Sequence, residues 1–99
     1  MTAVVEPRFD DIVHARHRLQ ICALLSDVDA VSFATAHEAL GVNDYVVSKH
    51  VKVLVEAGYV QTTKTRDLGR PQTWLRLTPA GKAAFDGHLA ALREMTAGH

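Results

Sequence analysis

The chain has a single cysteine, no long hydrophobic run and no surplus of charge of either sign. One cysteine, Cys22, excludes an intramolecular disulfide. No apolar run approaches the roughly 20 residues of a membrane-spanning helix. The first residues also lack the basic region and apolar stretch of a secretory signal. We therefore expect a cytoplasmic protein that does not span a membrane.

Sequence patterns of catalysis are also missing. The chain has no nucleophile with a base at a recognisable spacing, no glycine-rich phosphate loop and no paired-carboxylate motif. We expect no enzymatic activity and no cofactor. Its 99 residues, 47% of them hydrophobic, suffice for one core. The sequence predicts a flexible N-terminus over residues 1–8 and a single domain over residues 9–96.

The charges cancel in total but are unevenly distributed. Eleven Lys and Arg balance eleven Asp and Glu. Residues 43–76 hold six basic and three acidic side chains, a net charge of +3, whereas the remainder holds five and eight, a net charge of −3. This asymmetry is typical of a basic face on an acidic body. Because each copy has few cations, useful nucleic-acid binding would need two copies acting together.

The basic stretch begins with the pattern of a helix-turn-helix. Residues 32–40 predict a supporting helix, and Gly41 can adopt the left-handed conformation that a sharp turn needs. Asn43 can cap the next helix, which we expect over residues 43–57. Three apolar residues recur along it at steps of four and three, and so share one buried stripe: Val47, Val51 and Leu54. We predict that this second helix is a recognition helix.

The opposite face of the second helix is polar and charged. Such side chains suit the major-groove edges of bases and the flanking phosphates. The residues predicted to contact DNA from this helix are Asn43, Asp44, Tyr45, Ser48, Lys49 and Lys52. An ordinary solvated amphipathic helix shows the same pattern. The helix alone therefore leaves both interpretations open.

Two β-prone segments follow this helix, over residues 59–65 and 72–78. Between them, Gly69 and Pro71 mark a turn, and two arginines place cations on its tip. We predict a wing over about residues 59–78, which neutralises phosphates or enters the narrow minor groove. The wing residues predicted to contact DNA are Lys64, Arg66 and Arg70. Simple solvation, or protection of a sheet edge, is the alternative for a charged hairpin tip.

The segments on either side of this region predict helices over about residues 9–26 and 79–95. Thr78 and Pro79 supply an N-cap and a preset first residue for the second of them. Both helices carry more apolar surface than one small core requires, which favours a symmetric dimer. The residues predicted to form the dimer interface are Ile12, Leu19, Phe85, Leu89, Leu92 and Met95. The alternative is that the same stripe closes the core of one copy.

Taken in order, several short runs resemble the small winged-helix transcriptional regulators related to the MarR and ArsR types, especially their compact single-domain DNA-binding group. The runs are residues 18–25, 40–42, 48–52, 56–60, 69–74 and 77–81. The resemblance implies a mainly α fold with a small β-hairpin, a winged helix-turn-helix of the α+β class. It also implies a homodimeric repressor or activator that binds double-stranded DNA. Two-fold symmetry predicts a pseudo-palindromic site with half-sites about 10 bp or a multiple apart.

Six histidines raise the question of a sensor, because histidine titrates near neutral pH and binds metals. His14 and His17 lie one turn apart in the first predicted helix. Asp86, His88 and His99 resemble part of the terminal-helix metal site of some ArsR-type sensors. A metal-responsive sensor is therefore a lesser alternative, and our leading prediction is that the chain has no metal site.

The main alternative belongs to another class, a winged-helix domain that binds other proteins and has no specific affinity for DNA. The neutral overall charge suits it, whereas the cations on the recognition helix and wing favour DNA. Of the remaining residues, we expect Cys22 to be buried and Trp74 to pack in the core or at the root of the wing. We expect His50 to pack or to orient a phosphate. The leading prediction is a sequence-specific transcriptional regulator, a homodimeric repressor whose target promoter and effector stay open.

Overall fold

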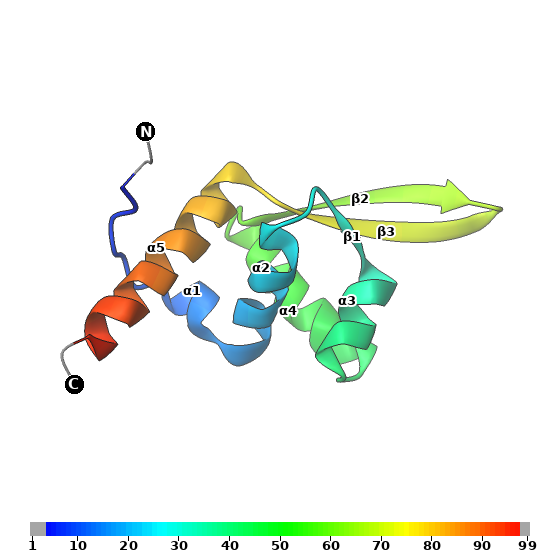
Figure 1. Ribbon diagram of the computed structural model, residues 1–99. Coiled ribbons are helices and arrows are strands. Elements are labelled where there is room, and N and C mark those ends of the chain that lie inside the picture. The colour runs from blue at the N-terminus through cyan, green and yellow to red at the C-terminus, as the bar shows by residue number, and fades with distance from the viewer. Residues whose placement is uncertain (1–3, 98–99) are drawn as a thin grey trace.

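The computed structural model describes residues 4–97, which form a helical body and a long β-hairpin that projects from it (Figure 1). The elements are α1 (Asp11–His14), α2 (Arg16–Ser26), β1 (Val31–Ser32), α3 (Phe33–Leu40), α4 (Asp44–Glu56), β2 (Val60–Asp67), β3 (Arg70–Leu77) and α5 (Pro79–Thr96). This is the mainly α winged helix-turn-helix that the sequence predicted. The recognition helix is α4, and the wing is the hairpin of β2 and β3.

The prediction of one continuous helix over residues 9–26 is wrong, because α1 and α2 are separate. The Asp10 carboxylate caps α1 by accepting hydrogen bonds from the N–H groups of Ile12 (2.8 Å) and Val13 (3.0 Å). Ala15 then adopts an extended conformation, with ψ of 134°, and ends the helix. Arg18 Nε donates to the Ile12 carbonyl at 2.5 Å, so this side chain takes the place of the backbone N–H that would bond to the carbonyl in a continuous helix. No proline or glycine marks this break in the sequence.

The helix-turn-helix is formed by α3 and α4, and its turn glycine and the cap of α4 are those that the sequence predicted. Ser32 precedes α3 and accepts a hydrogen bond from the Thr35 N–H at 3.1 Å. Gly41 ends α3 with φ of +68°, a conformation that residues with a Cβ adopt only at a cost. Asn43 Oδ1 accepts from the Val46 N–H at 3.0 Å and caps α4. Local capping therefore fixes where the recognition helix begins.

The core lies between α2, α4, β3 and the first turns of α5. The predicted stripe of α4 is buried in it, as expected. Its apolar members are Val13, Ile21, Cys22, Leu25, Val31, Ala36, Val47, Val51, Leu54, Val60, Leu75 and Phe85. Burial raises the pKa of the Cys22 thiol to about 11, so this cysteine is protonated at neutral pH and packs as a small apolar residue.

The sheet has three antiparallel strands in the order β1-β3-β2. The sequence did not predict β1, since two residues are too few for an alternating pattern. The wing strands pair from Val60 opposite Leu77 to Asp67 opposite Arg70. The predicted six-residue turn is therefore wrong. Four of its residues continue the strands and only Leu68 and Gly69 connect them.

The start of α5 is fastened to the end of α4. Thr78 Oγ1 accepts from the Gly81 N–H at 3.0 Å and donates to the Gly58 carbonyl at 2.6 Å. The Thr78 N–H donates to the Tyr59 carbonyl at 3.0 Å. Pro79 occupies the first turn, as the sequence indicates. A shift of α5 would therefore move the root of the wing.

The segment before α1 runs beside α5 in Figure 1. The Arg8 N–H donates to the Gly87 carbonyl at 2.9 Å. An ideal Cβ on Gly87 would lie 3.2 Å from the Glu6 carbonyl oxygen, so the two backbones approach closely. The sequence predicted that residues 1–8 are flexible. Within this segment Arg8 is hydrogen-bonded to α5, and residues 1–3 lie outside the described range.

Candidate nucleic-acid interface

The outward face of α4 carries the polar side chains that the sequence assigned to it. All six predicted residues are exposed: Asn43, Asp44, Tyr45, Ser48, Lys49 and Lys52. Tyr45 is largely exposed, with 75% of its surface accessible. Asn43 differs from the others because its Oδ1 caps the helix, leaving its amide N–H groups for a ligand. The face offers donors, acceptors and two ammonium groups, the mixture that base edges and phosphates bind.

The three wing cations that the sequence assigned to the interface, Lys64, Arg66 and Arg70, are exposed, and Arg76 on β3 is a fourth exposed cation. Arg66 Nη1 donates to the Gly69 carbonyl at 3.3 Å, which holds this guanidinium close to the tip. Trp74 Nε1 donates across the hairpin to Thr65 Oγ1 at 3.0 Å. Trp74 lies along β3 and is exposed. Of the two locations that the sequence predicted, the core and the root of the wing, the core is therefore wrong. Its ring braces the two long strands.

Arg18 attaches the recognition helix to α2, a contact that no sequence pattern predicted. Its guanidinium lies 3.1 Å from His50 Nδ1 on α4, while its Nε holds the Ile12 carbonyl. Burial and then the charge of Arg18 lower the pKa of His50. Because an arginine can only donate, His50 Nδ1 accepts and the ring is neutral. His50 therefore positions α4 and adds no charge to its face.

A chain of partly buried hydrogen bonds joins the root of the wing to α5. Tyr59 Oη donates to Asp10 Oδ2 at 2.6 Å, and this bond raises the pKa of the tyrosine. The Asp10 N–H donates in turn to His88 Nδ1 at 3.0 Å. His88 is completely buried. The chain connects residues up to 78 positions apart, which is why no local pattern reveals it.

The hydrogen bonds of His88 determine which of its ring nitrogens carries the proton. Since Nδ1 accepts from a backbone N–H, the neutral ring carries its proton on Nε2, which lies 3.0 Å from His14 Nδ1. His88 therefore donates to His14. The Phe9 ring packs on both imidazoles, with centroid distances of 4.8 Å to His14 and 4.7 Å to His88. Burial, and then the neighbouring His14, lower the pKa of His88.

The histidines are not arranged as the lesser metal-sensor alternative would require. His14 contacts His88, whereas His17 lies on α2 with its Nδ1 at 3.1 Å from Gln20 Oε1. In the described part of the chain, no group of three or more His, Cys, Asp or Glu could hold a metal ion. His99, the end of the hypothetical terminal-helix site, lies outside the described residues.

The predicted dimer residues occupy different environments. Phe85 is only 6% exposed and belongs to the core of the single chain, so it offers almost no surface to a partner. Ile12, Leu19 and Leu89 are partly buried against that core, and Leu92 is also partly buried. Met95, in the last turn of α5, is 56% exposed. Among the six predicted interface residues, Met95 therefore offers the most surface to a partner.

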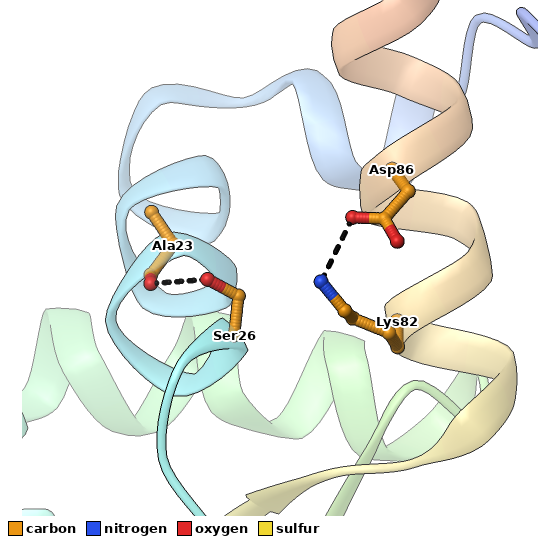
Figure 2. A network of polar contacts seen from close by, with 4 residues as sticks. All are labelled: Ala23, Ser26, Lys82 and Asp86. Atoms are coloured by element: carbon orange, nitrogen blue, oxygen red, sulfur yellow. Dashed lines mark hydrogen bonds and ion pairs between the residues drawn. The ribbon is translucent and has the colours of Figure 1, made fainter. Parts of the chain in front are cut away.

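Charge on the body of α5 is engaged locally. Lys82 Nζ lies 3.0 Å from Asp86 Oδ1 one turn along the helix, and Figure 2 shows this pair beside the end of α2, where Ser26 Oγ donates to the Ala23 carbonyl. The unengaged ammonium groups of Lys49 and Lys52 stand instead on α4. Over residues 4–97, no helix is long and apolar enough to cross a membrane.

An exposed polar face on the second helix of a helix-turn-helix, followed by a cationic hairpin, defines a winged-helix DNA-binding protein. The chain belongs to the winged helix DNA-binding domain family, whose model matches residues 17–96. Members of this class are regulators that bind DNA and are not enzymes. The chain is thus a small winged-helix DNA-binding regulator, as the sequence predicted.

The chain is similar to one protein of unassigned function in sequence and to several solved structures in fold. Protein MJ0432 of Methanocaldococcus jannaschii is 30% identical over 79 residues, which cover 80% of this chain and 86% of that protein. A transcriptional regulator homologue from Pyrococcus horikoshii superposes with a TM-score of 0.79 at 25% identity, over 85% of this chain and 83% of that one. The transcriptional repressor BigR from Xylella fastidiosa shares the fold, with a TM-score of 0.63 at 24% identity over 89% and 82%.

Proposed function

We propose that the protein is a cytoplasmic homodimeric repressor that reads a pseudo-palindromic operator in double-stranded DNA. In this proposal α4 enters the major groove, and the wing lies on the adjacent backbone or minor groove. The observation that carries it is the division of α4 into a buried apolar stripe and an exposed face of donors, acceptors and two lysines. A solvated surface helix also has a polar outer face, and the cationic wing that directly follows α4 favours the DNA-binding interpretation.

The wing supplies the second half of the proposed contact. Its strands of eight residues each extend by about 25 Å at the usual rise per residue. That reach suffices to bring Arg66 and Arg70 to phosphates beside the groove that α4 occupies. Because a contact to phosphate carries no sequence information, the wing would add affinity and α4 would add specificity.

Replacing Arg70 with alanine is expected to weaken binding to every duplex by a similar factor and to reduce the salt dependence of affinity. The slope of log affinity against log salt concentration should become shallower by about 0.9 for one bound copy and by about 1.8 for a dimer. The reason is that a phosphate contact that is no longer made no longer releases its counterion. Fluorescence anisotropy with labelled duplexes across a salt series measures both quantities. Lys82→Ala is the matched control, because that cation is paired with Asp86 on α5. An unchanged slope for Arg70→Ala would remove the wing from the interface.

The homodimer is proposed from the apolar surface that one copy leaves uncovered. Met95 is exposed in the last turn of α5, and Leu92 is partly exposed one turn before it. Helices at the two ends of the chain, α1 and α5, pack on each other, so a second copy could cover both. Two-fold symmetry would then present two recognition helices to two half-sites.

Replacing Met95 with glutamate is expected to weaken the dimer and leave the fold of each copy intact. A charge buried at the proposed interface should raise the dimer dissociation constant by roughly tenfold or more. Sedimentation velocity over a concentration series measures it. Val28→Glu changes an apolar residue of similar exposure between α2 and β1 and should leave association unchanged. Equal dissociation constants for wild type and Met95→Glu would place the interface elsewhere.

A further inference from the structure

The tip of the wing holds an exposed leucine in an unfavourable backbone conformation. Leu68 and Gly69 form the two-residue turn, with φ of 51° and 77°. Across residues 4–97, Leu68 is the one residue other than glycine with a positive φ. Its side chain is 96% exposed, so nearly all of its apolar surface meets solvent.

Neither the turn nor the core accounts for this leucine. A hairpin turn with positive φ at both positions favours Asn-Gly or Asp-Gly, and a residue with a branched apolar side chain is disfavoured there. The leucine makes no compensating contribution to packing, since it lies outside the core. Isolated exposed apolar residues are ordinary on protein surfaces. Exposure combined with a strained backbone at the furthest point of a projecting hairpin points instead to a contact made outside the chain.

Two cations flank the leucine in the last rungs of the hairpin. In the strand register, Arg70 lies opposite Asp67 and Arg66 lies opposite Pro71. The hydrogen bond from Arg66 to the Gly69 carbonyl keeps one guanidinium at the tip. An apolar side chain between two arginines is the chemistry by which proteins enter the minor groove, where arginines meet the negative potential and an apolar wedge separates stacked bases.

We propose that Leu68 is an apolar wedge that inserts into the minor groove of the bound duplex and partly unstacks one base step, while Arg66 and Arg70 contact the flanking backbone. This inference rests on the proposed operator binding and extends it to a second determinant of specificity. Pyrimidine–purine steps such as TA and CA unstack most easily. The wedge therefore selects for such a step at a fixed distance from each half-site, without hydrogen bonds to its bases.

The test replaces Leu68 with asparagine, which removes the apolar side chain and suits the same turn. The probe is the duplex enriched by the wild-type protein from a random pool, with 2-aminopurine in place of adenine at the pyrimidine–purine step nearest the wing. Wild type should raise the 2-aminopurine fluorescence on binding, because unstacking relieves its quenching. Leu68→Asn should abolish that rise and weaken binding by about tenfold, with an unchanged salt slope. Leu68→Met keeps an apolar tip and should retain both signals.

The outcomes separate this inference from the proposed function. If wild type binds no duplex, the proposed operator binding fails and the wedge fails with it. If wild type binds without a rise in fluorescence, or if Leu68→Asn binds with the affinity and the fluorescence of wild type, the wedge alone is wrong. A binding defect with a reduced salt slope would overturn it as well, because it would show that the tip acts through phosphates.

Discussion

Replacing Gly81 with alanine is expected to destabilise the fold by about 2 kcal/mol, the usual scale for forcing an extra methyl group into a packed site. A Cβ at this position would overlap the Tyr59 carbonyl oxygen and lie 2.9 Å from Leu77 Cδ1. The oxygen belongs to the backbone and also accepts the Thr78 N–H, so it cannot move aside cheaply. Urea unfolding followed by circular dichroism measures the loss.

Gly87→Ala is the matched control for this substitution, because both glycines lie in α5. Alanine is favoured over glycine within a helix by about 1 kcal/mol. At position 87 the added Cβ meets the Glu6 carbonyl oxygen at 3.2 Å, and the segment holding Glu6 is not part of any helix or strand, so it can shift. Gly87→Ala should therefore be close to neutral. Equal stability of Gly81→Ala and wild type would show that α5 is not packed directly on the end of the recognition helix.

Acid is expected to destabilise the protein through His88. Its folded pKa lies below the ordinary value of 6.5, since burial and the neighbouring His14 disfavour the charged ring, while Asp10 and Asp11 only partly oppose them. The native state then binds fewer protons than the unfolded chain, so stability falls as the pH drops below about 6.5. A proton on Nδ1 would also meet the Asp10 N–H, which now donates to that atom. The hydrogen bond from the Asp10 N–H, just before α1, to His88 on α5 would break.

His88→Leu separates this effect from general acid sensitivity. At pH 8 the variant should lose about 2 kcal/mol, because the buried Asp10 N–H has no acceptor. Below pH 6.5 its stability should change less with pH than that of wild type. Urea unfolding at a series of pH values measures both, with His37→Gln as the control, a histidine on α3 remote from α5. A wild-type profile that stays flat from pH 7 to pH 5 would contradict a neutral His88.

The recognition helix was predictable because its determinants are local. Asn43 caps it, the apolar residues recur at helical spacing, and Gly41 and Gly58 bracket it, all within 18 residues of sequence. Each of these signals reflects hydrogen bonds or sterics over a few positions. The exposed residues of its outer face followed once the buried stripe was known. Their contacts with DNA stay a prediction.

Other parts of the molecule depend on contacts between distant residues. The break at Ala15 is accompanied by a hydrogen bond from the Arg18 side chain to the Ile12 carbonyl, which the helical periodicity does not register. The strand β1 exists because Val31 pairs with Leu75, and two residues carry no pattern of their own. The bonds from Tyr59 to Asp10 and on to His88 assemble only after folding. Sequence reasoning therefore located the proposed interface but missed the framework that connects it to α5.

Selection of bound duplexes from a random-sequence pool by the purified protein tests the central claim most directly. The account predicts enrichment of an inverted repeat with half-sites about 10 bp or a multiple apart, bound by two copies with an affinity that falls steeply as salt rises. Enrichment of a single half-site by one copy would contradict the dimer. A folded protein that enriches no sequence and binds all duplexes weakly and equally would contradict operator recognition, and would favour a winged-helix domain that binds proteins.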